Sequence, residues 1–328
     1  MAEDTLALPW RTPKLKALRA PTEARVERDG NRIQLAVAAT AATFDGETGA
    51  LLSLERQGGK QILDGPRLSL WRAPTDNDAR TFLHLQEPGA VKWADLGLDK
   101  LEVVTSRVAL RERRGAPPTL SVVQTLRIPA SGASVAFERR YRLLASGALW
   151  MDHTVRIDPQ LKDLPRVGVV LALDPALEHL AWLGRGPLES YCDRHAAAAV
   201  GRYASTVTGQ TVPYIRPQAH GNHTETRWMA LRDAAGAGLL VTAPAPFDFT
   251  ALHFTEKDLA RTRHAHELVA RPEVILHLDA KHRGVGTGSC GPDALPRYRI
   301  KPGLHRFTFV LRSFGAEEEP ARLARSGG

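Results

Sequence analysis

Apolar and polar residues alternate with a period of two over many short segments of the chain. Residues 32–38 (RIQLAVA) and 149–157 (LWMDHTVRI) place apolar side chains at every second position, and so do residues 166–173 and 305–311. Alternation over such short runs is typical of half-buried β-strands. Turn pairs separate the runs, among them Asp29-Gly30, Asp45-Gly46, Ser131-Gly132 and Ser146-Gly147. The pattern therefore predicts an all-β protein.

Helical signals are scarce. One helix is expected to begin after Thr255, where Thr255 and Asp258 form a capping-box pattern. The chain lacks the strand–helix alternation of a (β/α) barrel, which needs eight helices in about 250 residues. Many short antiparallel strands instead predict one large sandwich over residues 23–316. Residues 1–22, with three prolines, are expected to be an N-terminal arm or linker, and residues 317–328 a C-terminal tail.

Composition narrows the classes of partner. The 328 residues carry a formal charge of +8, but the arginines are scattered and only residues 111–114 (RERR) are densely basic. Because basic and aromatic residues are not interleaved, we expect no nucleic-acid binding. No segment resembles a membrane span or a leader, and Cys192 and Cys290 are far apart in the sequence. We expect a cytoplasmic protein with free thiols and no membrane contact.

Residues 72–78 (RAPTDND) set an arginine before three carboxylate and amide side chains, Asp76, Asn77 and Asp78. An EF-hand calcium loop would continue with alternating oxygen ligands, a glycine and a distal glutamate, whereas Ala-Arg-Thr follows here. Half of an acid/base pair is a second possibility. Asp and Asn after proline also bond to their own backbone, and Arg72 is a suitable charge partner. We predict a structural connection in which Asp76 and Asp78 cap N–H groups or pair with arginine.

Two further segments combine glycine, proline, aromatic and charged residues. Residues 182–195 (WLGRGPLESYCDRH) imitate a phosphate loop only weakly, since no Lys-Ser/Thr pair follows the glycines. Glu189, Asp193 and Arg194 form either an acid/base set or a salt-bridged loop. Residues 213–228 (PYIRPQAHGNHTETRW) are similar to the wall of a sugar site, because aromatic faces stack on sugar C–H groups and amides bind hydroxyls. A loop packed on a neighbour fits that segment equally well.

Histidines give the one pattern that suggests a metal. His264 and His266 would share one face of an extended segment, and His277 and His282 follow at strand spacing. No carboxylate or cysteine stands at a matching position. We therefore expect no metal and no cofactor in this chain.

The motif segments also carry a family resemblance when they are taken in order. Residues 72–78, 184–195 and 213–228, followed by 263–268 (RHAHEL) and 282–293 (HRGVGTGSCGPD), resemble the C-terminal domain of family-two glycoside hydrolase β-galactosidases, which in some enzymes is a separate small chain. The resemblance covers about residues 23–314. It implies a large antiparallel supersandwich of the galactose mutarotase-like type, in agreement with the strand pattern.

The resemblance also implies that catalysis and pocket closure belong to different domains. The catalytic glutamates would lie in a barrel outside this chain, and this domain would pack on the barrel and close one side of a β-galactoside pocket. The matching positions, interpreted as loop architecture, are Arg72, Asp76, Asn77, Asp78, Gly184, Gly186, Pro187, Glu189, Tyr191, Asp193, Arg194, Pro213, Tyr214, Arg227, His264 and His282. Where the family's best-known enzymes carry a tryptophan as a sugar platform, this chain has Cys290, with Gly288 and Ser289 beside it. Stacking by a large ring is therefore missing from a loop expected to bind substrate.

Three functions remain open at this point. The first is a non-catalytic small subunit or C-terminal domain of a retaining β-galactosidase, inactive alone because both catalytic carboxyl groups lie in the barrel. The second is a stand-alone aldose epimerase of the mutarotase type, for which His220 or His223 with Glu189 or Glu225 would supply the acid and the base. The third is a carbohydrate-binding module without an enzyme partner.

Overall fold

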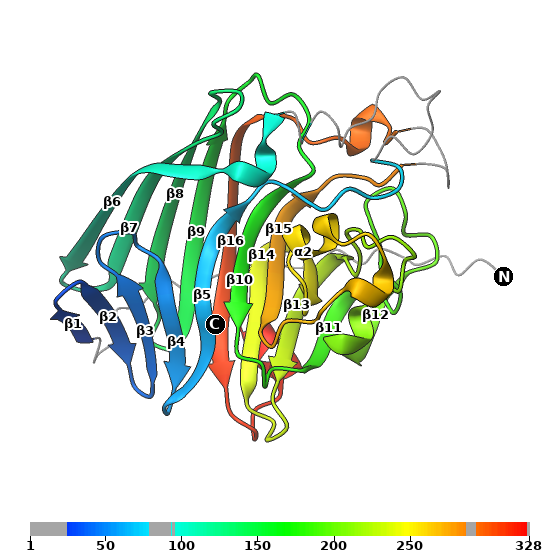
Figure 1. Ribbon diagram of the computed structural model, residues 1–328. Coiled ribbons are helices and arrows are strands. Elements are labelled where there is room, and N and C mark those ends of the chain that lie inside the picture. The colour runs from blue at the N-terminus through cyan, green and yellow to red at the C-terminus, as the bar shows by residue number, and fades with distance from the viewer. Residues whose placement is uncertain (1–24, 79–92, 94–95, 287–292, 327–328) are drawn as a thin grey trace.

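A computed structural model describes residues 25–78, 93, 96–286 and 293–326. Within these residues, sixteen antiparallel strands form one sheet with the main order β1-β2-β3-β4-β5-β10-β15-β14-β16-β9-β8-β7-β6, to which β13, β11 and β12 attach through β14 (Figure 1). The strands are β1 (Arg25–Asp29), β2 (Arg32–Val37), β3 (Thr40–Asp45), β4 (Leu51–Arg56), β5 (Gly59–Ser69), β6 (Glu102–Arg113), β7 (Ala116–Arg127), β8 (Ser134–Leu143), β9 (Ala148–Ile157), β10 (Arg166–Leu173), β11 (His179–Gly186), β12 (Ala199–Thr206), β13 (His223–Arg232), β14 (Gly238–Leu252), β15 (Val274–His282) and β16 (Gly303–Phe314). The helices are α2 (Glu256–Arg261), α3 (Pro320–Ser326) and the short 3-10 turns η1 (Leu98–Lys100), η2 (Thr208–Gln210), η3 (Ala265–Glu267) and η4 (Pro296–Tyr298).

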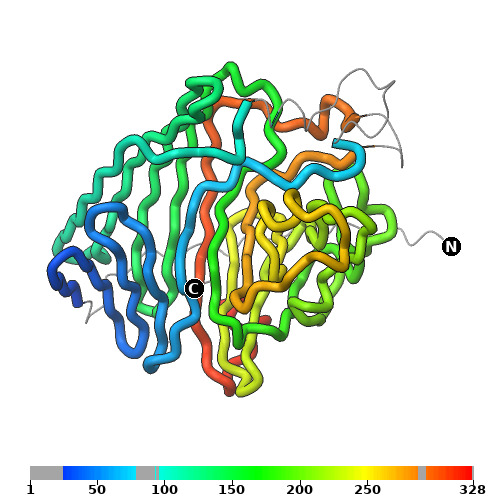
Figure 2. Tube along the Cα trace, in the orientation of Figure 1, coloured from blue at the N-terminus to red at the C-terminus, as the bar shows by residue number. Residues whose placement is uncertain are grey.

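The sheet curls until its two ends face each other. Figure 2 shows β1–β5 and β6–β9 as two layers of one curled trace. Phe44 on β3 and Tyr141 on β8 meet in the core between them, with ring centroids 4.9 Å apart, although their strands lie far apart in the sheet order. Burying both inner faces against each other is how a sheet of this size removes its apolar surface from water. The prediction of an all-β antiparallel sandwich is confirmed.

The predicted alternation is confirmed in residues 149–157, whereas residues 166–173 form a strand, β10, that is buried at most positions on both faces. In β9, Met151 and Val155 are buried while Asp152 and Thr154 are half-buried. His153 lies on the same buried face, where the period of two places it, and is 2% exposed although its side chain is polar. The predicted capping box is also present at α2: the Thr255 hydroxyl accepts from the N–H of Asp258, and the Asp258 carboxylate accepts from the N–H of Thr255.

Strand β14 changes partner along its length and so opens the sandwich. Residues 238–242 pair with β16, whereas residues 248–252 pair with β15. Pro244 and Pro246 lie between these two stretches. Proline has no N–H to donate to a sheet ladder, so pairing with β16 ends before the two prolines. Beyond this fork, the first half of β16 has no neighbour on its β14 side among the described strands.

The C-terminal segment belongs to the folded domain, where the sequence pattern suggested only a tail. Ala321 and Ala324 of α3 are buried in a small apolar cluster with Trp228 and Phe314. Among the helices that the structure describes, none is long and apolar enough to cross a membrane.

Candidate functional site

Four of the motif segments meet around one cavity of about 480 Å³. They come from positions as distant in sequence as residue 75 and residue 286. The residues that line the cavity are Thr75, Asp76, Asn77, Glu189, Tyr191, Asp193, Arg194, Tyr214, Gln218, Ala219, Val285 and Gly286. We call this convergence of loops the node. The resemblance placed these segments in one domain, and the structure brings them into contact.

Arg72 and Asp78 form the buried centre of the node. The Arg72 guanidinium, 0% exposed, donates from Nε and Nη2 to the two carboxylate oxygens of Asp78 at 3.0 and 2.9 Å. It also donates to the carbonyl oxygens of Arg283 and Gly284 at 2.7 and 3.0 Å. Asp78 accepts in addition from the N–H of Thr75 at 3.1 Å. The predicted pairing of Asp78 with an arginine is confirmed, and this arginine also ties residues 72–78 to the start of residues 282–293.

The other two members of the Asp-Asn-Asp segment hold neighbouring loops. Asp76 exchanges two hydrogen bonds with Gln218: its N–H donates to Oε1 at 2.8 Å, and its carboxylate accepts from Nε2 at 3.1 Å. The Asn77 side-chain amide donates to the carbonyl oxygen of Val285 at 2.9 Å. These contacts connect residues 72–78 to residues 213–228 and 282–293, as expected of a structural segment.

Asp193 fixes the backbone where residues 282–293 enter the cavity. Its two carboxylate oxygens accept from the N–H groups of Val285 and Gly286, each at 2.9 Å. The approach requires Gly284, because a Cβ at that position would lie 2.2 Å from the Asp193 carboxylate. A carboxylate bound to two consecutive backbone N–H groups makes charge-assisted hydrogen bonds, which are stronger than neutral ones.

Glu189 is the acceptor for most donors in its neighbourhood. It accepts from the Tyr214 hydroxyl at 2.5 Å, from the N–H of Gly221 at 2.8 Å, from the Tyr191 hydroxyl at 3.5 Å, and from the Arg194 guanidinium. Burial, reinforced by the negative charge of Glu189, raises the pKa of both tyrosines, so both hydroxyls stay protonated as donors. Of the two alternatives for this segment, the structure shows the salt-bridged loop.

The glycines of residues 182–195 serve packing and not phosphate binding. Gly184 and Gly186 lie at the end of β11, and no helix follows them. A Cβ on Gly184 would lie 2.9 Å from the Thr226 Cα, and one on Gly186 would lie 2.7 Å from the Tyr203 ring. Both glycines therefore allow close approach of neighbouring strands. Pro187 follows directly and leads into the Glu189 loop.

The remaining motif residues divide between the node and the surface. His282 is buried with its ring edge against Tyr191 at 5.4 Å, and burial lowers its pKa well below the usual value. Arg227 donates to the carbonyl oxygen of Glu225 at 2.6 Å. His264 and His266 stack on each other on an exposed segment. Within the part of the chain that the structure describes, no group of three or more His, Cys, Asp or Glu side chains is placed to hold a metal ion. Pro213 precedes Tyr214 in the same loop.

The substrate-binding loop inferred from the resemblance falls outside the described residues at Gly288, Ser289 and Cys290. Its two flanks are described and both are anchored to the node. Gly286 is held by Asp193, and Asp293 accepts from the Arg283 guanidinium at 2.7 and 2.9 Å. The role assigned to the three loop residues stays a prediction.

The proposed acid and base of an epimerase are engaged in structural contacts. Glu189 already serves several donors. His223 packs against the rings of Trp182 and Phe249 in tilted contacts. Its Nδ1 lies 3.1 Å from the Arg185 carbonyl oxygen, and its Nε2 lies 2.5 Å from the Gln210 side chain. Burial lowers the pKa of His223 to about 4.

The other two candidates, His220 and Glu225, also make contacts within the protein. His220 is buried, with Nδ1 2.8 Å from the Gln218 carbonyl oxygen. Glu225 pairs with Arg185 at 2.7 Å. Of these four groups, Glu189 lines the 480 Å³ cavity and the other three are not among its lining residues, so the cavity does not bring together the acid and base that proton transfer to a sugar hydroxyl requires.

Sequence reasoning missed two buried arginines beside the node. Arg283, 0% exposed, pairs with Asp163 at 2.8 Å as well as with Asp293. Arg166, 1% exposed, donates to Glu256 at 2.6 Å and lies 3.2 Å from Asp279. Burial raises the pKa of Asp279 to about 7. For Arg166 the sequence offers one signal, an arginine at the head of the otherwise apolar strand RVGVVLAL, and Arg283 has no comparable pattern around it.

Comparison with known proteins agrees with this assembly of loops. Residues 37–311 match the family model described as Beta galactosidase small chain. The chain is similar to β-galactosidases of Arthrobacter sp. (strain B7), with 34% identity over 294 residues, and of Vibrio cholerae serotype O1, with 30% identity over 291 residues. These alignments cover 83% and 87% of this chain but only 27% of either relative. The chain thus spans about a quarter of the length of the relatives that it matches.

Solved structures with a similar arrangement of strands include a galactose 1-epimerase from Lactobacillus acidophilus NCFM and a putative aldose 1-epimerase from Escherichia coli K12. The first has 12% sequence identity and a TM-score of 0.43, covering 90% of this chain and 99% of that one. The second has 11% identity and a TM-score of 0.46, covering 89% of this chain and 100% of that one. At these values the likeness says nothing about activity.

Proposed function

Because the chain belongs to the β-galactosidase small-chain family, we propose that it is the non-catalytic small subunit or C-terminal region of a retaining β-galactosidase. Its partner is the chain or domain that carries the catalytic barrel. In the assembled enzyme the node faces that barrel and closes one side of the pocket for a β-galactoside. The relatives, of which this chain covers 27%, support this division because the rest of their length leaves room for the barrel.

The observation that carries the proposal is the state of the carboxylates around the 480 Å³ cavity. A retaining glycosidase needs two carboxyl groups about 5–5.5 Å apart, one free to act as acid/base and one as nucleophile. Here Asp76 is bound to Gln218, Asp193 to two backbone N–H groups, and Glu189 to the donors around it. The cavity is therefore built to hold loops in place, which suits positioning of a substrate and exclusion of water more than proton transfer.

The hydrogen bonds of the node fix the two residues that flank residues 287–292. Asp193 holds Gly286 on one side and Arg283 holds Asp293 on the other, so both residues that flank these six positions are fixed to the node. Cys290, at the position that the family resemblance assigns to a sugar platform, would meet the substrate with a small side chain. We propose that the pocket of this enzyme is wider on that side than in relatives with a tryptophan.

Activity measurements on the pure chain test the proposal against its alternatives. We expect no hydrolysis of a chromogenic β-galactoside above a mock preparation, and no acceleration of the interconversion of α- and β-galactose. Turnover of the galactoside by the pure chain would contradict the assignment of both catalytic groups to the barrel. Anomer interconversion that is lost in the variant His223→Gln would instead establish the epimerase.

A further inference from the structure

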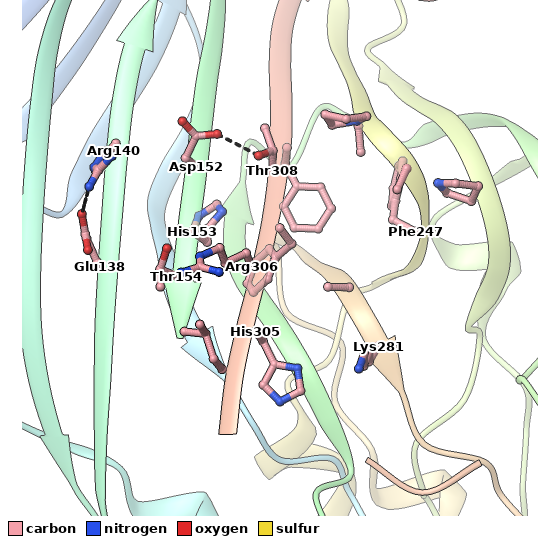
Figure 3. Close-up of a pocket in the computed structure, with 18 of the residues that line it drawn as sticks. Glu138, Arg140, Asp152, His153, Thr154, Phe247, Lys281, His305, Arg306 and Thr308 are labelled. Carbon is pink, nitrogen blue, oxygen red and sulfur yellow. Dashed lines mark hydrogen bonds and ion pairs between the residues drawn. The ribbon is translucent and has the colours of Figure 1, made fainter. Parts of the chain in front are cut away.

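A second cavity of the described chain lies away from the node, at the fork of β14. It is a groove of about 960 Å³ that shares no lining residue with the 480 Å³ cavity. Figure 3 shows β16 running through the middle of the view, with residues of β8 and β9 on one side and Phe247 of β14 and Lys281 of β15 on the other. The groove therefore exists because β14 leaves β16 at its proline pair.

Both carboxylates that line the groove are already bound by the protein. Glu138 accepts from Arg140 at 2.8 Å. Asp152 accepts from the Trp150 indole at 2.7 Å and from the Thr308 hydroxyl at 2.8 Å, and it is also paired with an arginine, Arg142. Two of these contacts, Glu138 with Arg140 and Asp152 with Thr308, are drawn in Figure 3.

Three cations of the groove, in contrast, make no ion pair with any described residue. They are Arg156 on β9, Lys281 on β15 and Arg306 on β16, and all three are exposed. In the β9–β16 register Arg306 lies opposite Thr154, two residues from Arg156, so the two arginines are diagonal neighbours on one face. Diagonal pairs of this kind lie about 7–8 Å apart, close enough for like charges to repel. An anionic ligand would relieve that repulsion.

An aromatic stack forms the apolar part of the same groove. Phe307 is half-buried and stacks on His153 with centroids 4.9 Å apart, and His153 stacks in turn on Phe137 at 5.9 Å. Burial, helped by the nearby charge of Arg139, lowers the pKa of His153 to about 3, so the central ring stays neutral and apolar near neutral pH. Phe307 lies opposite His153 in the register, and therefore on the other face of β16 from Arg306. Both side chains line the groove at the edge of β16 that is left without a β14 partner, so a ligand that crosses this edge can place a sugar C–H face on the ring and a carboxylate on the arginine.

We propose that this groove binds an acidic oligosaccharide, one that carries uronic-acid carboxylates, as a site separate from the galactoside pocket. The carboxylates pair with Arg156, Arg306 and Lys281, one sugar ring packs on Phe307, and Thr154 is available to sugar hydroxyls. The volume suits several sugar units rather than a single anion. The site needs no barrel partner, so it can be tested on the pure chain and does not depend on the proposed function of the node.

The test is calorimetric binding of trigalacturonate to the pure chain, compared with uncharged galactotriose and with inorganic phosphate. We expect trigalacturonate to bind at least tenfold more tightly than either, and the affinity to fall as salt is raised. The variants Arg306→Gln and Arg156→Gln should each weaken binding about tenfold, because each loses a charge-assisted contact. Arg107→Gln, which removes an exposed arginine of β6 outside the groove, is the matched control and should change little.

Other outcomes would overturn the proposal. Equal weakening by Arg107→Gln and Arg306→Gln would mean diffuse surface charge. If phosphate binds as tightly as trigalacturonate, and Phe307→Leu changes neither affinity, the groove is a site for simple anions and not for a sugar chain. Equal affinity for galactotriose would remove the role of charge, and no detectable trigalacturonate binding would remove the site altogether.

Discussion

Gly284 offers the sharpest test of how the node is held together. In the variant Gly284→Ala, the added methyl group would lie 2.2 Å from the Asp193 carboxylate, far inside van der Waals contact. The methyl sits on the backbone and cannot turn away, so the carboxylate must move. That movement breaks the hydrogen bonds from the N–H groups of Val285 and Gly286, both at 2.9 Å.

The size of the effect follows from those two hydrogen bonds. A hydrogen bond to a charged group contributes about 1.5–3 kcal/mol net. Two such bonds sum to about 3–6 kcal/mol. Asp193 is half-buried and regains some hydration when it moves, so we expect a loss at or just below the lower end of this sum, about 2–3 kcal/mol in the free energy of unfolding. For a domain of this size such a loss lowers the melting temperature by roughly 3–4 °C. The flank of residues 287–292 is released at the same time, so KM of the assembled enzyme should rise as well.

Urea denaturation of the pure chain followed by tryptophan fluorescence measures the stability change. Gly59→Ala is the matched control, because a Cβ there lies 3.4 Å from the nearest atom outside its chain neighbours, an ordinary contact. We expect Gly59→Ala to be nearly neutral. A Gly284→Ala variant that is as stable as Gly59→Ala would refute the reasoning, since it would show that Asp193 does not hold this turn.

Three other side chains give separate tests. Arg72→Met leaves the buried Asp78 carboxylate without its main partner and should lower the free energy of unfolding by about 3–5 kcal/mol in urea denaturation. His223, with a folded pKa of about 4 against 6.5 when unfolded, stabilises the protein above pH 6.5, and that contribution, up to about 3 kcal/mol, should disappear as the pH falls to 4. A thiol reagent at pH 8 should label Cys290 alone, because burial raises the pKa of Cys192 to about 12, and the barrel partner should protect Cys290.

Each of these tests has a control or a contradicting result. Arg67→Met removes an arginine whose side chain is 73% exposed and should cost less than about 0.5 kcal/mol. Stability measured at pH 7 and pH 5 should differ less in His223→Gln than in the unmodified chain, and an equal difference would mean that His223 does not take up a proton on unfolding. Labelling of Cys290 at the same rate with and without the barrel partner would separate that loop from the interface.

Local features of the fold could be predicted because they depend on neighbouring residues. Alternation in residues 149–157 gave the buried and exposed faces of β9, and the Thr255–Asp258 pattern gave the start of α2. The pairing of Arg72 with Asp78 was also within reach, since the two residues lie six positions apart. In each case the residues involved lie close together in the sequence, so a local sequence pattern is enough to predict the contact between them.

Contacts between distant segments could not be predicted in this way. Arg283 and Asp163 are 120 positions apart, and their meeting depends on the order in which sixteen strands pair. The same applies to the groove at the fork of β14. Pro244 and Pro246 are visible in the sequence, but only the observed partners β16 and β15 show that a cavity opens there. The ring partners of His153 are a further example, because Phe137 and Phe307 lie on strands that are distant in the sequence or paired only through the fold.

The central claim, that this chain completes a galactosidase whose catalytic groups lie elsewhere, is tested most directly by complementation. The barrel-bearing chain or region from the same organism is titrated with this chain, and hydrolysis of a chromogenic β-galactoside is measured at each ratio. The account predicts little activity from either part alone and a rise that saturates at one copy of this chain per barrel. It also predicts that Gly284→Ala gives a higher KM at saturation than Gly59→Ala. Full activity of the barrel without this chain, unchanged by its addition, would contradict the account.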